Sequence, residues 1–151
     1  MSDGMTIGAL ARAAGVAPQT VRWYEARGLL PPPARTEGGQ RRYDQAALKR
    51  LSFIRHAREL GLGLEDIHAL LELADNPAKP CAQADDIIRR NLRTVREKIA
   101  WLTALEKEFT RMLEECPSGT VRDCRVLEIL GDHGECLTPH RPPEDQATAE
   151  G

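Results

Sequence analysis

Four cysteines are the residues of this sequence best suited to chemistry, and their spacing favours a shared metal site. Cys116 and Cys124 lie eight positions apart in a segment that also contains a proline and a glycine, so they can flank a tight loop. Cys81 lies 35 residues before this pair, and Cys136 follows it. In a reducing compartment, free cysteines serve metal binding or redox sensing more often than structural disulfides. The four thiols therefore predict a metal-binding or redox-sensing protein.

Composition limits the architecture that can position these thiols. The chain has 151 residues, enough for one ordinary domain or for a small domain with an extended element. Aromatic residues make up 4% and charged residues 29%, which favours a helical protein with a modest core over an all-β protein. No apolar run approaches the roughly 18 residues of a membrane span, and the first residues do not form a signal peptide. We therefore expect a cytoplasmic protein that makes no membrane contact.

The net charge of −2 hides a strong asymmetry along the chain. Residues 1–58 contain ten Lys and Arg and four Asp and Glu. Residues 59–151 contain eleven Lys and Arg and nineteen Asp and Glu. The two parts therefore have net charges of +6 and −8. A basic amino-terminal part suits a phosphate-binding surface, although a run of charge is more often only a solvated face.

The stretch "TIGALARAAGVAPQTVRWYEARGLL" predicts a helix, a tight turn and a second helix. Ile7, Leu10 and Ala14 have helical spacing, Gly15 fits the turn, and Pro18 is tolerated in the first turn of the next helix. A helix that enters a major groove makes its contacts near its amino end. The candidate contacts there are Gln19, Thr20 and Arg22.

A small hairpin, or wing, is predicted to follow in "PPPARTEGGQRRY". The prolines exclude a helix, and Gly38 and Gly39 supply a turn between two short extended pieces. Basic and aromatic side chains flank this turn: Arg35 on one side, and Arg41, Arg42 and Tyr43 on the other.

A second helix-turn-helix unit is predicted from residue 44 onwards. Asp44 is a suitable N-cap, and the segment "GLG" interrupts the helical pattern near residue 62. The apolar residues that we expect to be buried are Leu48, Leu51, Ile54 and Leu60.

Together these motifs resemble the DNA-binding domain of the MerR family, bacterial regulators named for mercury resistance. The pairing of "TVRWYEARGLL" with "GGQRRY" carries this resemblance, which extends over about residues 5–125. Trp23 departs mildly from the Phe or Tyr that is more usual at its position. The resemblance implies DNA contacts by Arg22, Tyr24, Arg35, Arg41 and Tyr43.

Some of these residues have an alternative interpretation. Tyr24 and Tyr43 could serve mainly as core residues, and Arg42 could be a solvated surface charge. These alternatives stay open at the level of sequence.

A long amphipathic helix is predicted between Pro80 and Pro117, over about 30 to 35 residues. Its apolar residues alternate four and three apart, with Glu106 as the one polar interruption, and form a coiled-coil seam. The seam comprises Ile88, Leu92, Val95, Ile99, Leu102, Phe109 and Leu113. A homodimer would bury this seam, and the alternative is that the helix packs against its own DNA-binding domain.

The helix separates Cys81 from Cys116 by about 50 Å, so the two thiols cannot bind one ion within a chain. In an antiparallel pair of helices, the start of one helix lies beside the end of the other. Cys81 would then meet the partner subunit's Cys116 and the partner subunit's Cys124. The alternative is that the three cysteines are buried and pack as small apolar residues.

This layout is similar to that of the metal-sensing branch of the MerR family. The resemblance implies that Cys81, Cys116 and Cys124 form the sensor site, and that a cysteine at position 81 selects zinc, cadmium, lead or mercury. Serine there is typical of relatives that sense monovalent copper, silver or gold. Three further residues could complete the site or could belong to a mobile tail: His133, Cys136 and His140.

We therefore predict a mostly α protein with a winged helix-turn-helix domain, a long antiparallel coiled-coil helix and a short metal-binding loop. The predicted segments are residues 1–75 for DNA binding, 76–115 for the linker and dimerisation helix, 116–136 for the loop and a short helix, and 137–151 for a disordered tail.

The predicted function is a homodimeric transcription activator that responds to a divalent metal. By resemblance, it binds a palindrome in double-stranded promoter DNA, and the metal makes it distort that DNA so that RNA polymerase can engage the promoter. The alternative is a thiol- or redox-responsive regulator of the same fold. The sequence contains no nucleophile and base at a characteristic spacing and no glycine-rich phosphate loop. It therefore does not suggest an enzyme.

Overall fold

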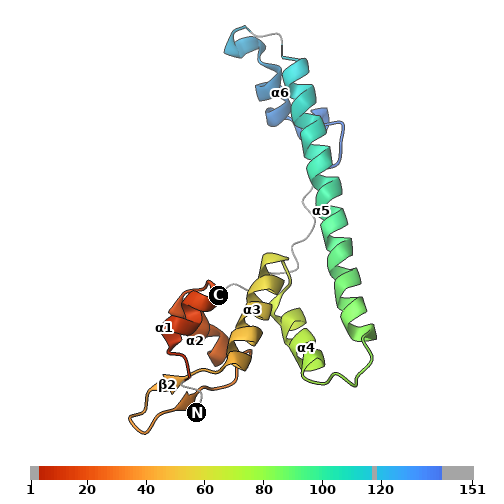
Figure 1. Ribbon diagram of the computed structural model, residues 1–151. Coiled ribbons are helices and arrows are strands. Elements are labelled where there is room, and N and C mark those ends of the chain that lie inside the picture. Colours follow the sequence, from red (N-terminus) through yellow and green to blue (C-terminus); the bar gives the residue numbers. More distant parts are fainter. Residues whose placement is uncertain (1–3, 117–118, 141–151) are drawn as a thin grey trace. The chain divides into compact units, whose positions relative to one another are not determined.

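The computed structural model describes residues 4–116 and 119–140, so Pro117 and residues 141–151 of the predicted tail lie outside the described residues. The chain divides into two compact units, Met1–Asp85 and Asp86–Gly151, which we describe separately. Figure 1 shows the helices and strands along the chain. Among the described residues, no helix combines the length and apolar character that a membrane span requires.

The first helix-turn-helix consists of α1 (Ile7–Ala14) and α2 (Pro18–Ala26). The Thr6 side chain caps α1 by accepting a hydrogen bond from the Ala9 amide at 3.2 Å. Gly15 ends the helix with a φ of 70°, and a Cβ at this position would clash with the Arg55 guanidinium. The predicted turn at Gly15 is therefore confirmed, and it also allows close packing of α1 against α3.

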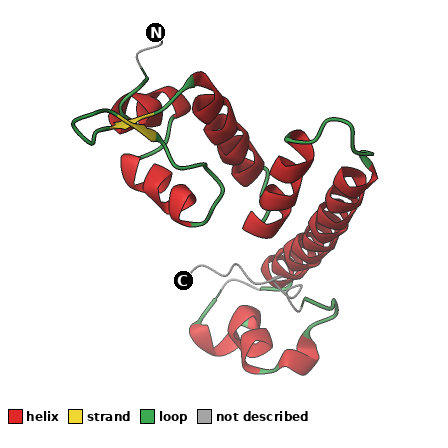
Figure 2. Ribbon diagram, turned by 90° about the horizontal axis from the view of Figure 1, so that it is seen from below, coloured by secondary structure: helices red, strands yellow, loops and turns green. Residues whose placement is uncertain are grey.

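The wing is a two-stranded antiparallel sheet of β1 (Ala34–Arg35) and β2 (Arg41–Arg42). Ala34 pairs with Arg42, and Arg35 pairs with Arg41. Gly39 has a φ of 79° in the connecting turn, which favours glycine there. Figure 2 shows these short strands in yellow beside the helices of the first unit. The predicted hairpin is confirmed.

The second helix-turn-helix consists of α3 (Gln45–Glu59) and α4 (Leu64–Ala74). Asp44 is the N-cap of α3, as predicted, and its carboxylate accepts a hydrogen bond from the Ala47 amide at 2.8 Å. The prediction that Leu60 is buried is wrong, because this residue is 68% exposed. α3 ends before Leu60, and the chain turns at Gly61 with a φ of 83°, so that Leu62 takes the buried position.

One hydrophobic core holds the first unit together. It is formed by apolar side chains from α1 to α4 and from the segments that follow α2 and β2. Its fully buried members include Leu10, Val21, Leu51, Ile54 and Ile67. Burial of side chains of this size stabilises the fold by about 1.5–3 kcal/mol each, which fixes the helices that carry the candidate DNA contacts.

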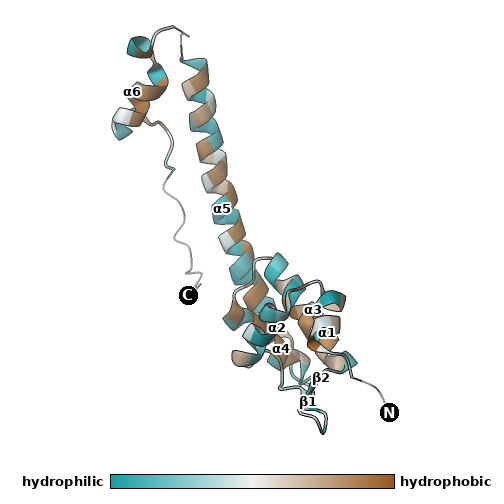
Figure 3. Cartoon of the chain, turned by 90° about the vertical axis from the view of Figure 1, so that its left-hand side faces the viewer, coloured by the Kyte–Doolittle hydropathy of each residue, from teal (hydrophilic) through white to brown (hydrophobic). Residues whose placement is uncertain are grey.

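The second unit contains most of α5 (Ala82–Glu114), a single helix of 33 residues. This length agrees with the predicted 30 to 35 residues. All seven residues of the predicted coiled-coil seam are exposed, with fractions between 44% at Leu92 and 74% at Leu113. Figure 3 shows that apolar segments recur along α5. The single chain therefore leaves the predicted dimer seam uncovered.

A short carboxy-terminal segment packs on the end of α5 in the second unit. It consists of the 3-10 helix η1 (Val121–Asp123), α6 (Arg125–Gly131) and the 3-10 helix η2 (His133–Glu135). Ile129 of α6 is 1% exposed and Met112 of α5 is 6% exposed, so these helices share a small apolar core.

Candidate nucleic-acid interface and metal centre

The candidate DNA contacts of the first helix-turn-helix lie at the start of α2. Gln19 and Thr20 are in its first turn and Arg22 follows in the second. Gln19 and Arg22 are exposed, and Thr20 is half-buried. Within the described part of the chain, Arg22 makes no hydrogen bond or ion pair, so its guanidinium is available to an external anion.

Glu25 connects this helix to the wing. Its carboxylate accepts a hydrogen bond from Tyr43 Oη at 2.5 Å and forms an ion pair with Arg41 Nη1 at 3.0 Å. Burial, and the negative carboxylate beside it, raise the pKa of Tyr43, so the phenol stays protonated and donates. Glu25 was not predicted as a site residue from the sequence, although it is the one acidic residue of α2.

Tyr24 and Tyr43 are buried, with exposed fractions of 7% and 2%. Both belong to the core of the first unit, where the Tyr24 ring lies edge-on to Trp23 at 5.3 Å between centroids. The alternative that these tyrosines act by packing is therefore supported by their burial. Direct DNA contact by either residue stays a prediction.

The remaining wing arginines are more accessible. Arg35 is exposed and donates a hydrogen bond to the Gly39 carbonyl at 3.2 Å, which braces the turn. Arg42 is half-buried and donates to Gln40 Oε1 at 3.3 Å. Both guanidinium groups retain further N–H donors, because each carries five.

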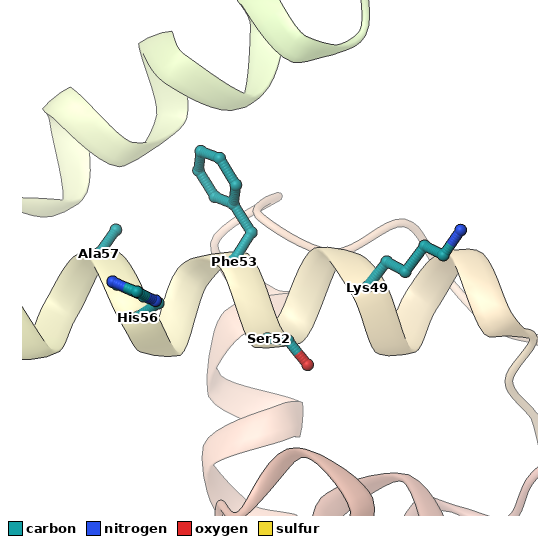
Figure 4. A pocket seen from close by; sticks show the side chains of 5 residues that line it. All are labelled: Lys49, Ser52, Phe53, His56 and Ala57. Atoms are coloured by element: carbon teal, nitrogen blue, oxygen red, sulfur yellow. The ribbon is translucent and has the colours of Figure 1, made fainter.

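A surface cavity of about 450 Å³ lies elsewhere on the first unit, along α3. Figure 4 shows the five side chains that line it: Lys49, Ser52, Phe53, His56 and Ala57. None of the predicted site residues contributes to this cavity. It therefore does not bear on the predicted DNA contacts or metal ligands.

The three predicted thiol ligands flank α5. Cys81 immediately precedes α5 and is exposed. Cys116 lies just beyond the other end of the helix, and Cys124 is the N-cap of α6; both are half-buried. All four cysteines are free thiols. The two loop cysteines are thus more exposed than small core residues, which favours ligands over packing.

The structure does bring three other predicted residues together. The ligand atoms of His133, Cys136 and His140 all lie within 4.8 Å of one another. Within the described ranges, this is the one group of at least three such residues close enough to hold an ion. Neither Cys116 nor Cys124 belongs to it.

Glu108 of α5 anchors the segment that carries these residues. It is 2% exposed, and one carboxylate oxygen accepts hydrogen bonds from the Leu137 and Thr138 amides at 2.8 and 2.5 Å. The other oxygen forms an ion pair with Arg111 Nη2 at 3.0 Å. Hydrogen bonds with Thr138 and with Arg111 lower the pKa of Glu108 to about 2 despite its burial.

Arg111 and Trp101 fix the same segment at two further points. Arg111 Nη2 donates to the Glu135 carbonyl at 2.7 Å, and Trp101 Nε1 donates to the His140 carbonyl at 2.8 Å. Residues 137–140, assigned from sequence to the tail, are therefore bonded to α5. No local sequence pattern predicts these contacts, because they join residues 24 and 39 positions apart.

Comparisons with known proteins identify the family of the chain. A family model described as "MerR HTH family regulatory protein" matches residues 5–74, and a second, "MerR, DNA binding", matches residues 48–112. The regulator ZntR of Escherichia coli K12 is 39% identical over 128 residues, covering 82% of this chain and 90% of ZntR. The chain belongs to the MerR family.

Two further relatives of this MerR-family chain are informative. The mercuric resistance operon regulatory protein of Bacillus cereus is 36% identical over 125 residues, covering 82% of this chain and 95% of the relative. The regulator PbrR691 from Ralstonia metallidurans, whose crystal structure contains lead(II), has a sequence 41% identical to this chain. It has a TM-score of 0.74 and covers 83% of this chain and 98% of that one.

Membership of the MerR family makes this chain a DNA-binding transcriptional regulator, and its relatives are regulators and not enzymes. The two family models span α1 to α4 and most of α5. They end at residue 112, so the cluster of His133, Cys136 and His140 lies outside both.

Proposed function

We propose that the protein is a cytoplasmic, metal-responsive activator that binds promoter DNA as an antiparallel homodimer. The observation that carries this proposal is α5: a 33-residue helix with an uncovered apolar seam and a cysteine beyond each end. A seam of this length exposed in water disfavours a monomer, and a second copy of the same helix covers it by knobs-into-holes packing.

The proposed sensor site combines thiols from two subunits. A helix of 33 residues is about 50 Å long, so Cys81 and Cys116 of one chain are too far apart to share an ion. An antiparallel pair brings Cys81 to the partner subunit's Cys116 and the partner subunit's Cys124. The dimer then carries two such sites, one at each end of the paired helices.

The proposed ligand is a soft divalent ion, namely zinc, cadmium, lead or mercury. Three thiolates bring negative charge that offsets a 2+ ion, and soft sulfur prefers soft metals. A relative named as a mercuric resistance operon regulatory protein, and a regulator crystallised with lead(II), support this class of ion.

The proposed DNA surface combines the start of α2 with the wing. Its candidate residues are Gln19, Thr20, Arg22, Tyr24, Arg35, Arg41, Arg42 and Tyr43. In the dimer two such surfaces bind a palindrome. Bending a short duplex costs several kcal/mol, so a small shift of the two surfaces on metal binding changes the DNA conformation that RNA polymerase meets.

A competition titration tests this function directly. The reduced protein is titrated with zinc, cadmium, lead and mercury, and transcription from a promoter carrying its palindrome is measured for each ion. We expect tight binding with thiolate-to-metal absorption and activation by at least one ion. Activation by oxidants with no effect of any metal would instead identify a redox-responsive regulator.

A further inference from the structure

The carboxy-terminal cluster has the composition of a metal site of a different chemical kind. Its three ligand atoms come from two imidazoles and one thiol, all within eight residues of one chain. Around a tetrahedral zinc ion, with bonds of about 2.0–2.3 Å, neighbouring ligand atoms are about 3.3–3.6 Å apart. The observed separations of up to 4.8 Å therefore need side-chain shifts of only about 1 Å to close on an ion.

The backbone of this cluster is fixed from both sides. The Cys136 amide donates to the His133 carbonyl at 3.1 Å, which sets the first two ligands one 3-10 turn apart. The Glu108 carboxylate then holds the two amides that follow, and Trp101 holds the His140 carbonyl. A mobile tail with incidental histidines would not be tied to α5 at each of these points.

The orientation of His140 suits a ligand. Its Nδ1 lies 2.9 Å from the Thr138 carbonyl oxygen. Because a carbonyl only accepts, Nδ1 carries the proton, and the lone pair of the neutral ring is at Nε2. Metal-binding histidines commonly show this arrangement, in which the second nitrogen donates to a backbone carbonyl. The His133 ring lies edge-on to it, with centroids 4.9 Å apart.

The cluster lines a cavity of about 350 Å³ with a mainly apolar wall. This wall is formed by Leu105, Phe109, Met112, Ile129 and Leu130. An apolar shell limits access of water to a bound ion and strengthens its bonds to the ligands. Glu108 also lines the cavity, but both of its oxygens are engaged by the backbone and by Arg111, so it acts as a support and not as a ligand.

We propose that His133, Cys136 and His140 form a second metal site, contained within one chain and separate from the three-thiol site. Two neutral imidazoles and one thiolate suit a borderline ion such as zinc in tetrahedral geometry, with water in the fourth position. Such an ion links His133 and Cys136 to His140 within this one segment. This site needs no partner subunit, so it stands independently of the proposed sensor.

Cobalt(II) is a suitable probe, because it replaces zinc and its spectrum reports geometry and thiolate ligation. The full-length protein with Cys81→Ser, Cys116→Ser and Cys124→Ser keeps Cys136 as its one thiol. We expect it to bind one cobalt per chain, with the visible bands of tetrahedral coordination and one thiolate charge-transfer band. Adding Cys136→Ser should remove the charge-transfer band.

Histidine variants give the matched comparison. His133→Ala or His140→Ala should weaken cobalt binding more than about tenfold. Loss of a residue that only hydrogen-bonds to a metal ligand already weakens metal binding by about tenfold or more, and loss of the ligand itself should weaken it further. His68→Ala, on the exposed face of α4, should leave it unchanged. Equal cobalt affinity in all three variants would overturn the proposal.

A second measurement keeps all cysteines in place. Zinc stoichiometry of the reduced wild type is compared with that of His133→Ala/His140→Ala. A loss of one zinc per chain supports the separate site, whether the three-thiol site binds zinc or not. If the zinc stoichiometry is unchanged but the zinc affinity is altered, these histidines complete the three-thiol site. If neither the stoichiometry nor the affinity changes, they bind no metal. Both results overturn the proposal.

Discussion

The Tyr43 hydroxyl donates a hydrogen bond to the Glu25 carboxylate at 2.5 Å, and this contact ties the end of the wing to the candidate recognition helix. Arg41 shares the same carboxylate. A single acidic side chain of α2 therefore binds both Tyr43 and Arg41. The wing itself has only two residues in each strand, too few to hold its position by strand pairing alone.

Tyr43→Phe tests this connection. Removing one hydrogen bond to a charged group should lower the free energy of unfolding by about 1.5–3 kcal/mol. Operator affinity should also fall, because the wing loses one of its two ties to α2. Chemical denaturation and a binding titration measure the two effects. For the unfolding measurement the control is Tyr24→Phe: this ring is equally a core residue, but the described structure gives its hydroxyl no hydrogen bond.

Arg22→Ala should weaken operator binding while leaving the fold intact, because the side chain is exposed on α2. A base contact would cost about 1–3 kcal/mol and relax sequence preference, whereas a phosphate contact would reduce the slope of log affinity against log salt by about 1. Binding titrations at several salt concentrations distinguish the two cases. Unchanged affinity in folded protein removes Arg22 from the interface, and Arg93→Ala on α5 controls for the loss of one positive charge.

Local features of this fold could be predicted from the sequence, whereas contacts between distant residues could not. The turn at Gly15 and the N-cap at Asp44 were predicted correctly, because each depends on residues within a few positions. Burial of Leu60 was predicted wrongly, because helical spacing was extended past the end of α3. The anchoring of Thr138 by Glu108 joins residues 30 positions apart, and only the folded chain shows that a charge on α5 is matched by backbone amides.

Acid should release the carboxy-terminal segment from α5. The pKa of Glu108 is held at about 2, below its ordinary value of 4.5. Between these values the unfolded chain binds more protons than the folded chain, so this contribution to stability is complete above about pH 4.5 and is lost as the pH falls towards 2. A loss of stability as the pH falls is the direction expected for a carboxylate in a salt bridge.

Trp101 reports this change, because its indole donates to the His140 carbonyl. In a Trp23→Phe background, Trp101 fluorescence should show a transition between about pH 4.5 and pH 2. Glu108→Gln should show the released spectrum already at neutral pH, whereas Glu114→Gln, an exposed neighbour on α5, should behave as the parent protein does. A parent spectrum that is flat across this range would contradict the assigned role of Glu108.

The sensor site across two subunits is tested with mixed dimers. One chain carries Cys81→Ser and the other carries Cys116→Ser with Cys124→Ser, both in a His133→Ala/His140→Ala background that removes the second site. Neither parent homodimer retains three thiols in one proposed site. In the mixed dimer one end combines only substituted positions, while the other combines an intact Cys81 with the partner's Cys116 and the partner's Cys124.

We therefore expect the mixed dimer to bind one ion tightly, half the wild-type number, with the thiolate-to-metal absorption that both parents lack. Dimer composition is verified first by two affinity tags, one on each chain. If verified mixed dimers bind no better than their parents, the three thiols do not meet across an antiparallel pair. If the Cys81→Ser parent alone binds fully, position 81 is not a ligand and selection of a divalent ion must rest on Cys116 and Cys124. Either result would remove the physical link between the length of α5 and metal sensing.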